Sequence, residues 1–66
     1  MIHLIVLKTR IFGKAAFAIE NITLIVRIDY KTRIYTSDGM YTEVAEPVEE
    51  IVKRINQIVY GDKQTS

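Results

Sequence analysis

The chain contains no cysteine and no tryptophan, and it has a single proline among its 66 residues. Without cysteine it forms neither disulfides nor thiolate metal sites, which is typical of a protein in a reducing compartment. Its longest apolar runs are far shorter than the about 20 residues of a membrane span, and the N-terminus lacks the pattern of a signal peptide. We therefore expect a cytoplasmic location and no membrane insertion.

An excess of charge of one sign is also missing, because nine basic residues face eight acidic ones and the net charge is +1. The basic residues are scattered along the chain, so the sequence carries no electrostatic footprint for nucleic acid. The one histidine, His3, has no acidic neighbour in sequence, and no nucleotide-binding, metalloprotease or hydrolase motif occurs. We predict no enzyme activity, no catalytic residues, no cofactor and no metal.

Hydrophobic residues make up 48% of the chain against 26% charged residues, which is the balance of a globular protein. The sequence predicts one small domain over residues 1–61, followed by a disordered polar tail over residues 62–66. A domain of this size buries only about 60% of its unfolded surface, so a monomer needs additional stabilisation.

Residues 32–44 read as a β-hairpin, because Asp38-Gly39 lies between two runs rich in Tyr, Ile, Thr and Val. A two-residue loop would place a charge beside an apolar residue on both faces. A three-residue loop with Gly39 in the left-handed region gives better pairs, and we prefer it. The expected pairs are Thr36 with Met40, Tyr35 with Tyr41, Ile34 with Thr42, Arg33 with Glu43, and Thr32 with Val44.

A helix over residues 47–60 is expected to follow the hairpin. Pro47 suits the first helical position, Glu49 and Glu50 suit the positive helix start, and Gly61 suits a C-terminal cap. The two glutamates also lie four residues before Lys53 and Arg54, a spacing that favours ion pairs. An apolar stripe recurs at helical spacing, made of Val48, Ile51, Val52, Ile55 and then Ile58 or Val59.

Two further segments read as strands. Residues 2–7 are apolar on both faces, with His3, Ile5 and Leu7 on one of them. Residues 22–28 are expected to place Ile22, Leu24, Val26 and Ile28 on the core face and Ile25 on the outer face. Residues 15–19 are read as a short strand or an extended arm. The expected fold class is α+β, an antiparallel meander of about four strands with one C-terminal amphipathic helix on one face.

One helix covers only one side of such a sheet, which leaves apolar side chains without a cover. If these side chains come together, their apolar patch is larger than soluble monomers usually expose. A two-fold dimer is the commonest way to bury such a patch. We therefore expect a homo-oligomer, a dimer, and an unknown protein partner. The predicted interface residues are Ile5, Leu7, Ile25, Arg33, Tyr35 and Tyr41.

Residues 32–55 resemble the FlbD-like family of small bacterial proteins associated with flagella. The similarity lies in a T-x-I strand, a turn glycine and a V-x-E-x-V-E-E helix start, and the opening Ile2-His3-Leu4 is also similar. The resemblance implies a non-enzymatic accessory protein in motility that acts through protein contacts. The residues that carry it are Thr32, Ile34, Gly39, Val44, Glu46, Val48, Glu49 and Glu50.

The leading functional hypothesis is a small non-enzymatic protein-interaction module that acts as a homo-oligomer. The first alternative is a single-stranded nucleic-acid-binding or regulatory protein, in which Arg33, Tyr35 and Tyr41 stack on bases and neutralise phosphates. A purely structural interpretation of that face is an ordinary sheet surface made of a tyrosine pair and an Arg/Glu pair. The second alternative is a structural protein of a phage or a bacterium.

Overall fold

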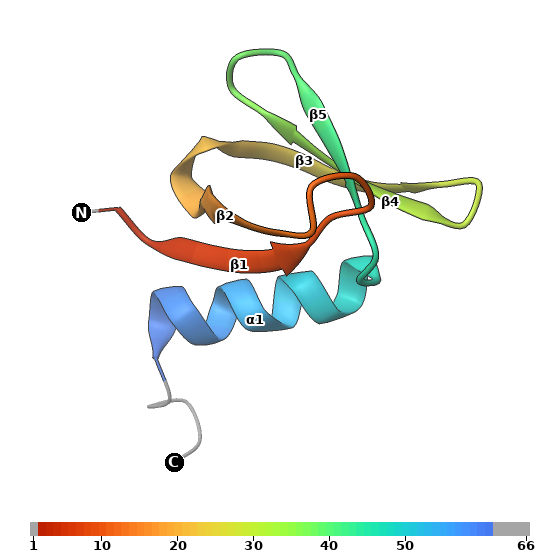
Figure 1. The fold of residues 1–66 in the computed structure, drawn as a ribbon. Coiled ribbons are helices and arrows are strands. Elements are labelled where there is room, and N and C mark those ends of the chain that lie inside the picture. Colours follow the sequence, from red (N-terminus) through yellow and green to blue (C-terminus); the bar gives the residue numbers. More distant parts are fainter. Residues whose placement is uncertain (1, 62–66) are drawn as a thin grey trace.

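The computed structural model describes residues 2–61, which form five strands, a 3-10 turn and one α-helix (Figure 1). The predicted tail of residues 62–66 lies outside the described residues. The fold class is α+β, as the sequence predicts. The elements in chain order are β1 (Leu4–Lys8), β2 (Lys14–Ala18), η1 (Ile19–Asn21), β3 (Ile22–Ile28), β4 (Lys31–Thr36), β5 (Tyr41–Val44) and α1 (Val48–Tyr60).

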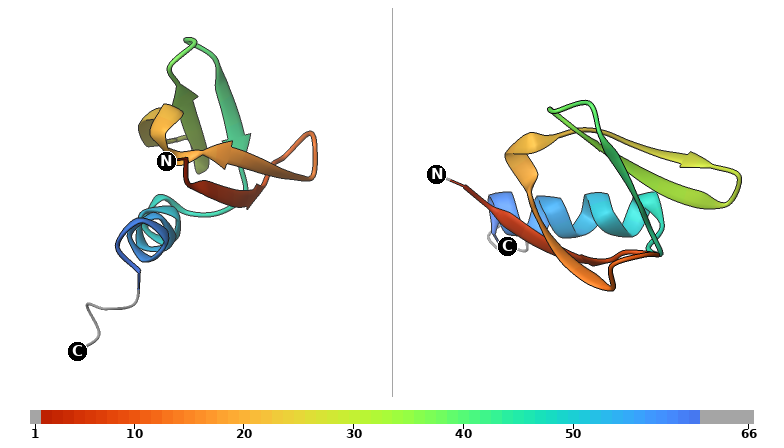
Figure 2. Two further views of the ribbon diagram at one scale, coloured as in Figure 1. Left: turned by 90° about the vertical axis from the view of Figure 1, so that its left-hand side faces the viewer. Right: turned by 45° about the horizontal axis from the view of Figure 1, so that its top comes forward.

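The strands form two antiparallel sheets, β1-β2 and β3-β4-β5, where the sequence predicts a single sheet of about four strands. The segment at residues 15–19 is a strand paired with β1, rather than an unpaired arm. The turn η1 separates β2 from β3, and Figure 2 shows the two sheets crossing there. A change of strand direction at such a corner divides one sheet into two layers that enclose a core.

The two sheets are joined where β1 ends. Thr9 forms an isolated bridge with Val44 of β5. The N–H of Ala45 donates to the Lys8 carbonyl at 2.9 Å, and the N–H of Arg10 donates to the Glu43 carbonyl at 3.1 Å. The chain of β1 therefore pairs with β2 along its length and with β5 at its end.

A small aliphatic core lies between the two sheets and the helix. Each of its members is at most 2% exposed, and Phe17, Ile19, Ile22, Ile25 and Ile55 pack against it while remaining partly exposed. Side chains buried this completely each contribute roughly 1.5–3 kcal/mol relative to exposure. The fully buried members are Ile5, Leu7, Ile34, Val44 and Ile51.

The β4-β5 hairpin confirms the three-residue loop, since all four ladder pairs follow the predicted register. The N–H of Thr36 also donates to the Met40 carbonyl at 3.0 Å, and Gly39 has φ +87°. Asp38 accepts hydrogen bonds from the Thr36 hydroxyl at 2.6 Å and the Met40 N–H at 3.0 Å. These bonds hold the pKa of Asp38 below its usual value.

The predicted faces of β3 are wrong beyond its first residue. The register with β4 shifts between Ile22 and Leu24, so Thr23 is an extra residue that opposes no partner. A bulge of this kind reverses the alternation that follows it. Ile25 therefore pairs with Ile34 and packs against the core, whereas Leu24, Val26 and Ile28 lie on the other face.

Helix α1 begins one residue later than predicted and ends at the predicted residue. Pro47 is the N-cap, with extended backbone and a carbonyl that accepts the N–H of Ile51 at 3.1 Å, and Gly61 follows Tyr60 with φ +71°. The expected partner of Arg54 is corrected, because its guanidinium binds Glu46 Oε1 at 2.9 Å and the Val6 carbonyl at 2.9 Å. Arg54 therefore links the helix to β1, whereas an ion pair within the helix would link only two turns of the helix itself.

Replacing Ile51 with alanine tests the core. We expect Ile51→Ala to lower the free energy of unfolding by about 3 kcal/mol, because it leaves a cavity at a fully buried position. The matched control is Val52→Ala, which changes a neighbouring residue that is 43% exposed and should cost less than about 1 kcal/mol. Urea titrations followed by circular dichroism measure both values. Equal losses for the two variants would contradict the assignment of Ile51 to the core.

Replacing Tyr30 tests strain in the β3-β4 turn. Asp29 and Tyr30 have φ +51° and +67°, and Tyr30 is 91% exposed. The left-handed region costs a bulky residue about 1–2 kcal/mol, which asparagine largely avoids. Tyr30 also lies 5.6 Å from the Arg27 guanidinium, and this contact offsets part of the gain. We expect Tyr30→Asn to raise the free energy of unfolding by about 0.5–1 kcal/mol in urea titrations, and a loss of stability would refute the strain.

Candidate functional site

The face of the β3-β4-β5 sheet opposite the core is rich in apolar side chains. Residues that are paired across strands point to the same side, so the register groups eight residues of β3, β4 and β5. Leu24 and Tyr41 are about half exposed, at 51% and 48%. We call this surface the outer sheet face, and its residues are Leu24, Val26, Ile28, Lys31, Arg33, Tyr35, Tyr41 and Glu43.

Arg33 lies at the centre of this face and contacts three of its neighbours. Its guanidinium carbon is 4.3 Å from the centroid of the Tyr41 ring, and Nη1 donates to the Tyr35 hydroxyl at 3.3 Å. Nε is 3.5 Å from Glu43 Oε2. The two tyrosine rings are 5.3 Å apart and tilted by 46°.

These contacts affect both the charge and the rigidity of the outer sheet face. The hydrogen bond that Arg33 donates to the Tyr35 hydroxyl is the main reason that the pKa of Arg33 is raised above its usual value, so the guanidinium remains charged. The contact with the Tyr41 ring and the ion pair with Glu43 are each weak, because both are accessible to solvent. Together they hold the arginine flat against the aromatic rings.

The structure brings together three of the six predicted interface residues. Arg33, Tyr35 and Tyr41 are neighbours on the outer sheet face. Ile5 and Leu7 are instead buried inside the monomer, because the pleat of β1 turns them toward the helix and β4. Ile25 also packs against the core, owing to the bulge at Thr23.

Sequence reasoning missed the apolar part of this face. Leu24, Val26 and Ile28 replace Ile25 as its β3 residues. The sequence contains one sign of the bulge. The apolar run that follows Asn21 is longer than a strict alternation of inward and outward residues allows. The position of a bulge within such a run depends on the partner strand, and the sequence of β3 alone does not specify it.

His3 has an acidic partner that is distant in sequence. Its Nδ1 lies 2.6 Å from Glu20 Oε2, and its backbone N–H donates to Glu20 Oε1 at 3.0 Å. The His3 carbonyl accepts the N–H of Ile19 at 2.8 Å. Both carboxylate oxygens are therefore occupied by His3, and the pair clamps the start of β1 to η1. Its geometry suits a structural contact.

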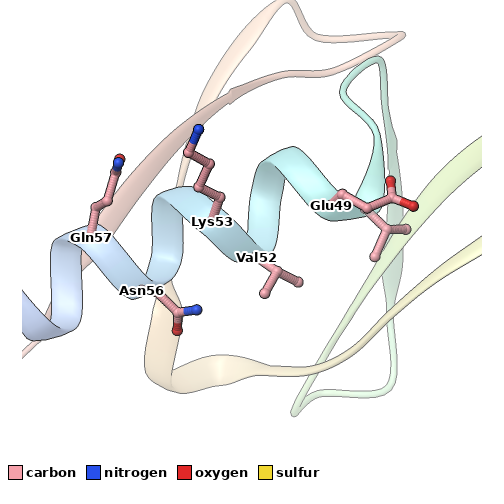
Figure 3. A pocket seen from close by; sticks show the side chains of 6 residues that line it. Glu49, Val52, Lys53, Asn56 and Gln57 are labelled. Atoms are coloured by element: carbon pink, nitrogen blue, oxygen red, sulfur yellow. The ribbon is translucent and has the colours of Figure 1, made fainter. Parts of the chain in front are cut away.

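A shallow depression runs along the solvent-facing side of α1. All of its lining residues come from the helix, and Figure 3 shows Lys53 and Gln57 pointing away from Val52 and Asn56. Polar groups that diverge in this way do not form a binding site. Within residues 2–61, no three metal-ligating side chains gather, and no helix is long and apolar enough to cross a membrane.

The loop between β1 and β2 lies beside the outer sheet face. Ile11 and Phe12 of this loop form a shallow groove with Tyr41, Thr42 and Glu43 of β5. Ile11 is 82% exposed and Phe12 is 74% exposed, so both are available to a partner. Sequence reasoning assigned no role to this segment.

Comparison of the chain with protein-family models, curated proteins and solved structures found no match. The resemblance to the FlbD-like family therefore receives no support from these comparisons and stays a prediction. The candidate site consequently depends on the geometry of the outer sheet face alone.

Lowering the pH tests the clamp between His3 and Glu20. The hydrogen bond from the His3 side chain lowers the pKa of Glu20 from 4.5 to about 2. A carboxylate with a lowered pKa contributes stability above its unfolded value of 4.5, and this contribution is lost as the pH falls toward 2. Unfolding titrations of wild type and Glu20→Gln should therefore differ most above pH 4.5 and converge between pH 4.5 and 2.

The comparison with Glu20→Gln cancels the contributions of the other carboxyl groups, including Asp38. His3→Ala removes the side-chain hydrogen bond and keeps the one from the His3 backbone N–H, so it should show a smaller loss of stability that also diminishes at low pH. A difference between wild type and Glu20→Gln that stays constant over this range would contradict the clamp.

Proposed function

We propose that this protein is a non-enzymatic interaction module that forms a homodimer through the outer sheet face. The observation that supports the proposal is the apolar surface made by Leu24, Val26, Ile28 and the two tyrosines. Helix α1 packs against β1 and β3 (Figure 1), and it approaches this surface only at its edge, where Leu24 shares a shallow depression with Val52 and Ile55.

The energetics of a small domain favour burial of such a face. Leu24 and Tyr41 each keep about half of their surface in water in the monomer. Complete burial of a large apolar side chain is worth roughly 1.5 kcal/mol or more, although association entropy offsets part of the sum. A two-fold axis through the face would place the apolar side chains of one copy against those of the other. Two-fold symmetry is the commonest symmetry of soluble oligomers.

The charged pair on this face favours a protein partner over nucleic acid. Arg33 donates one side-chain hydrogen bond, to Tyr35, and its guanidinium lies over the Tyr41 ring, which covers one of its faces. Glu43 also places a negative charge where a phosphate would approach. A partly exposed arginine that stacks on tyrosine is instead typical of a protein interface, where arginine and tyrosine are enriched.

Sedimentation equilibrium at micromolar concentrations tests the dimer. We expect wild type to sediment as a dimer and Leu24→Lys to weaken association at least about tenfold, because it buries an unpaired charge at the interface. The matched control is Tyr60→Lys, which places the same charge on a residue that is 68% exposed at the end of α1 and should leave the dimer intact. A stable wild-type monomer would refute the proposal.

Binding to single-stranded oligonucleotides tests the nucleic-acid alternative. Phosphate contacts make the affinity fall steeply with salt, whereas a mostly apolar protein interface is much less sensitive. No binding at low salt would exclude the alternative. Salt-sensitive binding that Tyr35→Ala and Tyr41→Ala both abolish would favour it over the dimer.

A further inference from the structure

The β1-β2 loop, residues 9–13, is held rigidly by Thr9. The Thr9 hydroxyl accepts the N–H of Phe12 at 2.9 Å and donates to the Gly13 carbonyl at 2.7 Å. The N–H of Thr9 donates to the same carbonyl at 2.7 Å, and Gly13 reverses the chain with φ +76°. Thr9 itself is only 5% exposed, so these bonds are largely shielded from water.

This rigid loop presents two large apolar side chains to solvent. Ile11 and Phe12 are among the most exposed hydrophobic residues of the described chain. The two views of Figure 2 show the loop projecting at the edge of the molecule, away from α1. A projecting apolar tip can enter another apolar medium without any rearrangement of the fold.

Three cations surround the tip. Lys8, Arg10 and Lys14 are all exposed, and none forms an ion pair with another residue of the described chain. The two carboxylates that line the neighbouring grooves are already engaged, Glu43 by Arg33 and Glu46 by Arg54. The loop therefore keeps its positive charge, although the whole chain is almost neutral.

One pair of these cations is unfavourable for folding. Lys8 and Lys14 lie directly opposite each other in the β1-β2 ladder. Like charges at opposed positions of an antiparallel pair destabilise the sheet by a few tenths of a kcal/mol. A local conflict of this kind is expected where residues serve binding rather than stability.

We propose that the β1-β2 loop docks the protein onto an anionic lipid surface. Ile11 and Phe12 enter the boundary between headgroups and acyl chains, and Lys8, Arg10 and Lys14 contact the negative headgroups. Interfacial binding of this type combines apolar burial with attraction to anionic lipid and needs no membrane-spanning segment.

Two features favour lipid over other polyanions. Nucleic acid is bound by stacking of bases on aromatic rings, and the loop offers one ring beside an isoleucine that cannot stack. A folded protein partner would need an acidic pocket for the tip, whereas a fluid interface accepts two adjacent apolar side chains of any shape. The loop adjoins the outer sheet face, because Ile11 and Phe12 share a groove with Tyr41 and Glu43, but its three cations are not among the residues of that face.

Vesicle co-sedimentation tests the proposal. The full chain is mixed with vesicles of phosphatidylcholine alone, or with about 30% phosphatidylserine, which creates the negative surface potential. We expect at least about tenfold stronger partitioning onto the anionic vesicles at low salt, and most of this preference should be lost at about 0.5 M salt, because screening removes it. Equal partitioning onto both vesicle types would overturn the proposal.

Three variants separate the apolar tip from the cations. Ile11→Ser combined with Phe12→Ser should reduce binding to anionic vesicles about tenfold by removing the inserted groups. Lys14→Glu should reduce it at least about fivefold and yet raise the unfolding midpoint, because it replaces a like-charge pair by an opposite one. The control Tyr30→Asn removes an exposed aromatic residue from the β3-β4 turn and should bind like wild type.

The pattern across these variants decides the interpretation. Wild-type binding by the double serine variant, with an unchanged midpoint and circular dichroism spectrum, would overturn the proposal. Equal loss for Tyr30→Asn would also overturn it, because it would indicate nonspecific adsorption. Binding of a thymidine oligonucleotide as tight as vesicle binding, and equally sensitive to Phe12→Ser, would assign the loop to nucleic acid instead.

Discussion

The junction between Thr9 and Val44 is the constraint on which the rest of the structure depends. It ties the end of β1 to the end of β5, so that two sheets close around one core. The hydroxyl of Thr9 also holds the β1-β2 loop, which makes one buried residue responsible for both core closure and loop shape. A chain of this length has few residues to spare, and such double use is a consequence of its size.

The apolar residues of the chain divide into two groups with different roles. Within residues 2–61, five apolar side chains are fully buried, among them Ile5 and Ile51, and they come from β1, β4, β5 and α1. A larger number, including Leu24 and Phe12, remain in contact with water. A 66-residue chain that is 48% hydrophobic therefore has more apolar surface than its own core buries. That excess is the physical basis for the proposed dimer and for lipid docking.

Residues close in sequence were sufficient to predict the local features. The Asp38-Gly39 turn and the tyrosine pair beside it follow from backbone preferences and side-chain alternation, which act over a few residues. The same holds for the end of α1 at Gly61 and for the apolar stripe that carries Ile51. These features depend on short-range sterics and hydrogen bonds, so sequence alone established the hairpin, its register and the helix.

Long-range contacts were required for the rest. The bulge at Thr23 arises from pairing with β4, and it exchanges Ile25 for Leu24 on the outer sheet face. The clamp between His3 and Glu20 and the anchoring of Arg54 to β1 join residues that are 17 and 48 positions apart. No periodicity records such partners, because they depend on how the two sheets cross. Local sequence patterns thus determine the strands and the helix, whereas the way in which the two sheets cross determines which apolar face remains exposed to water.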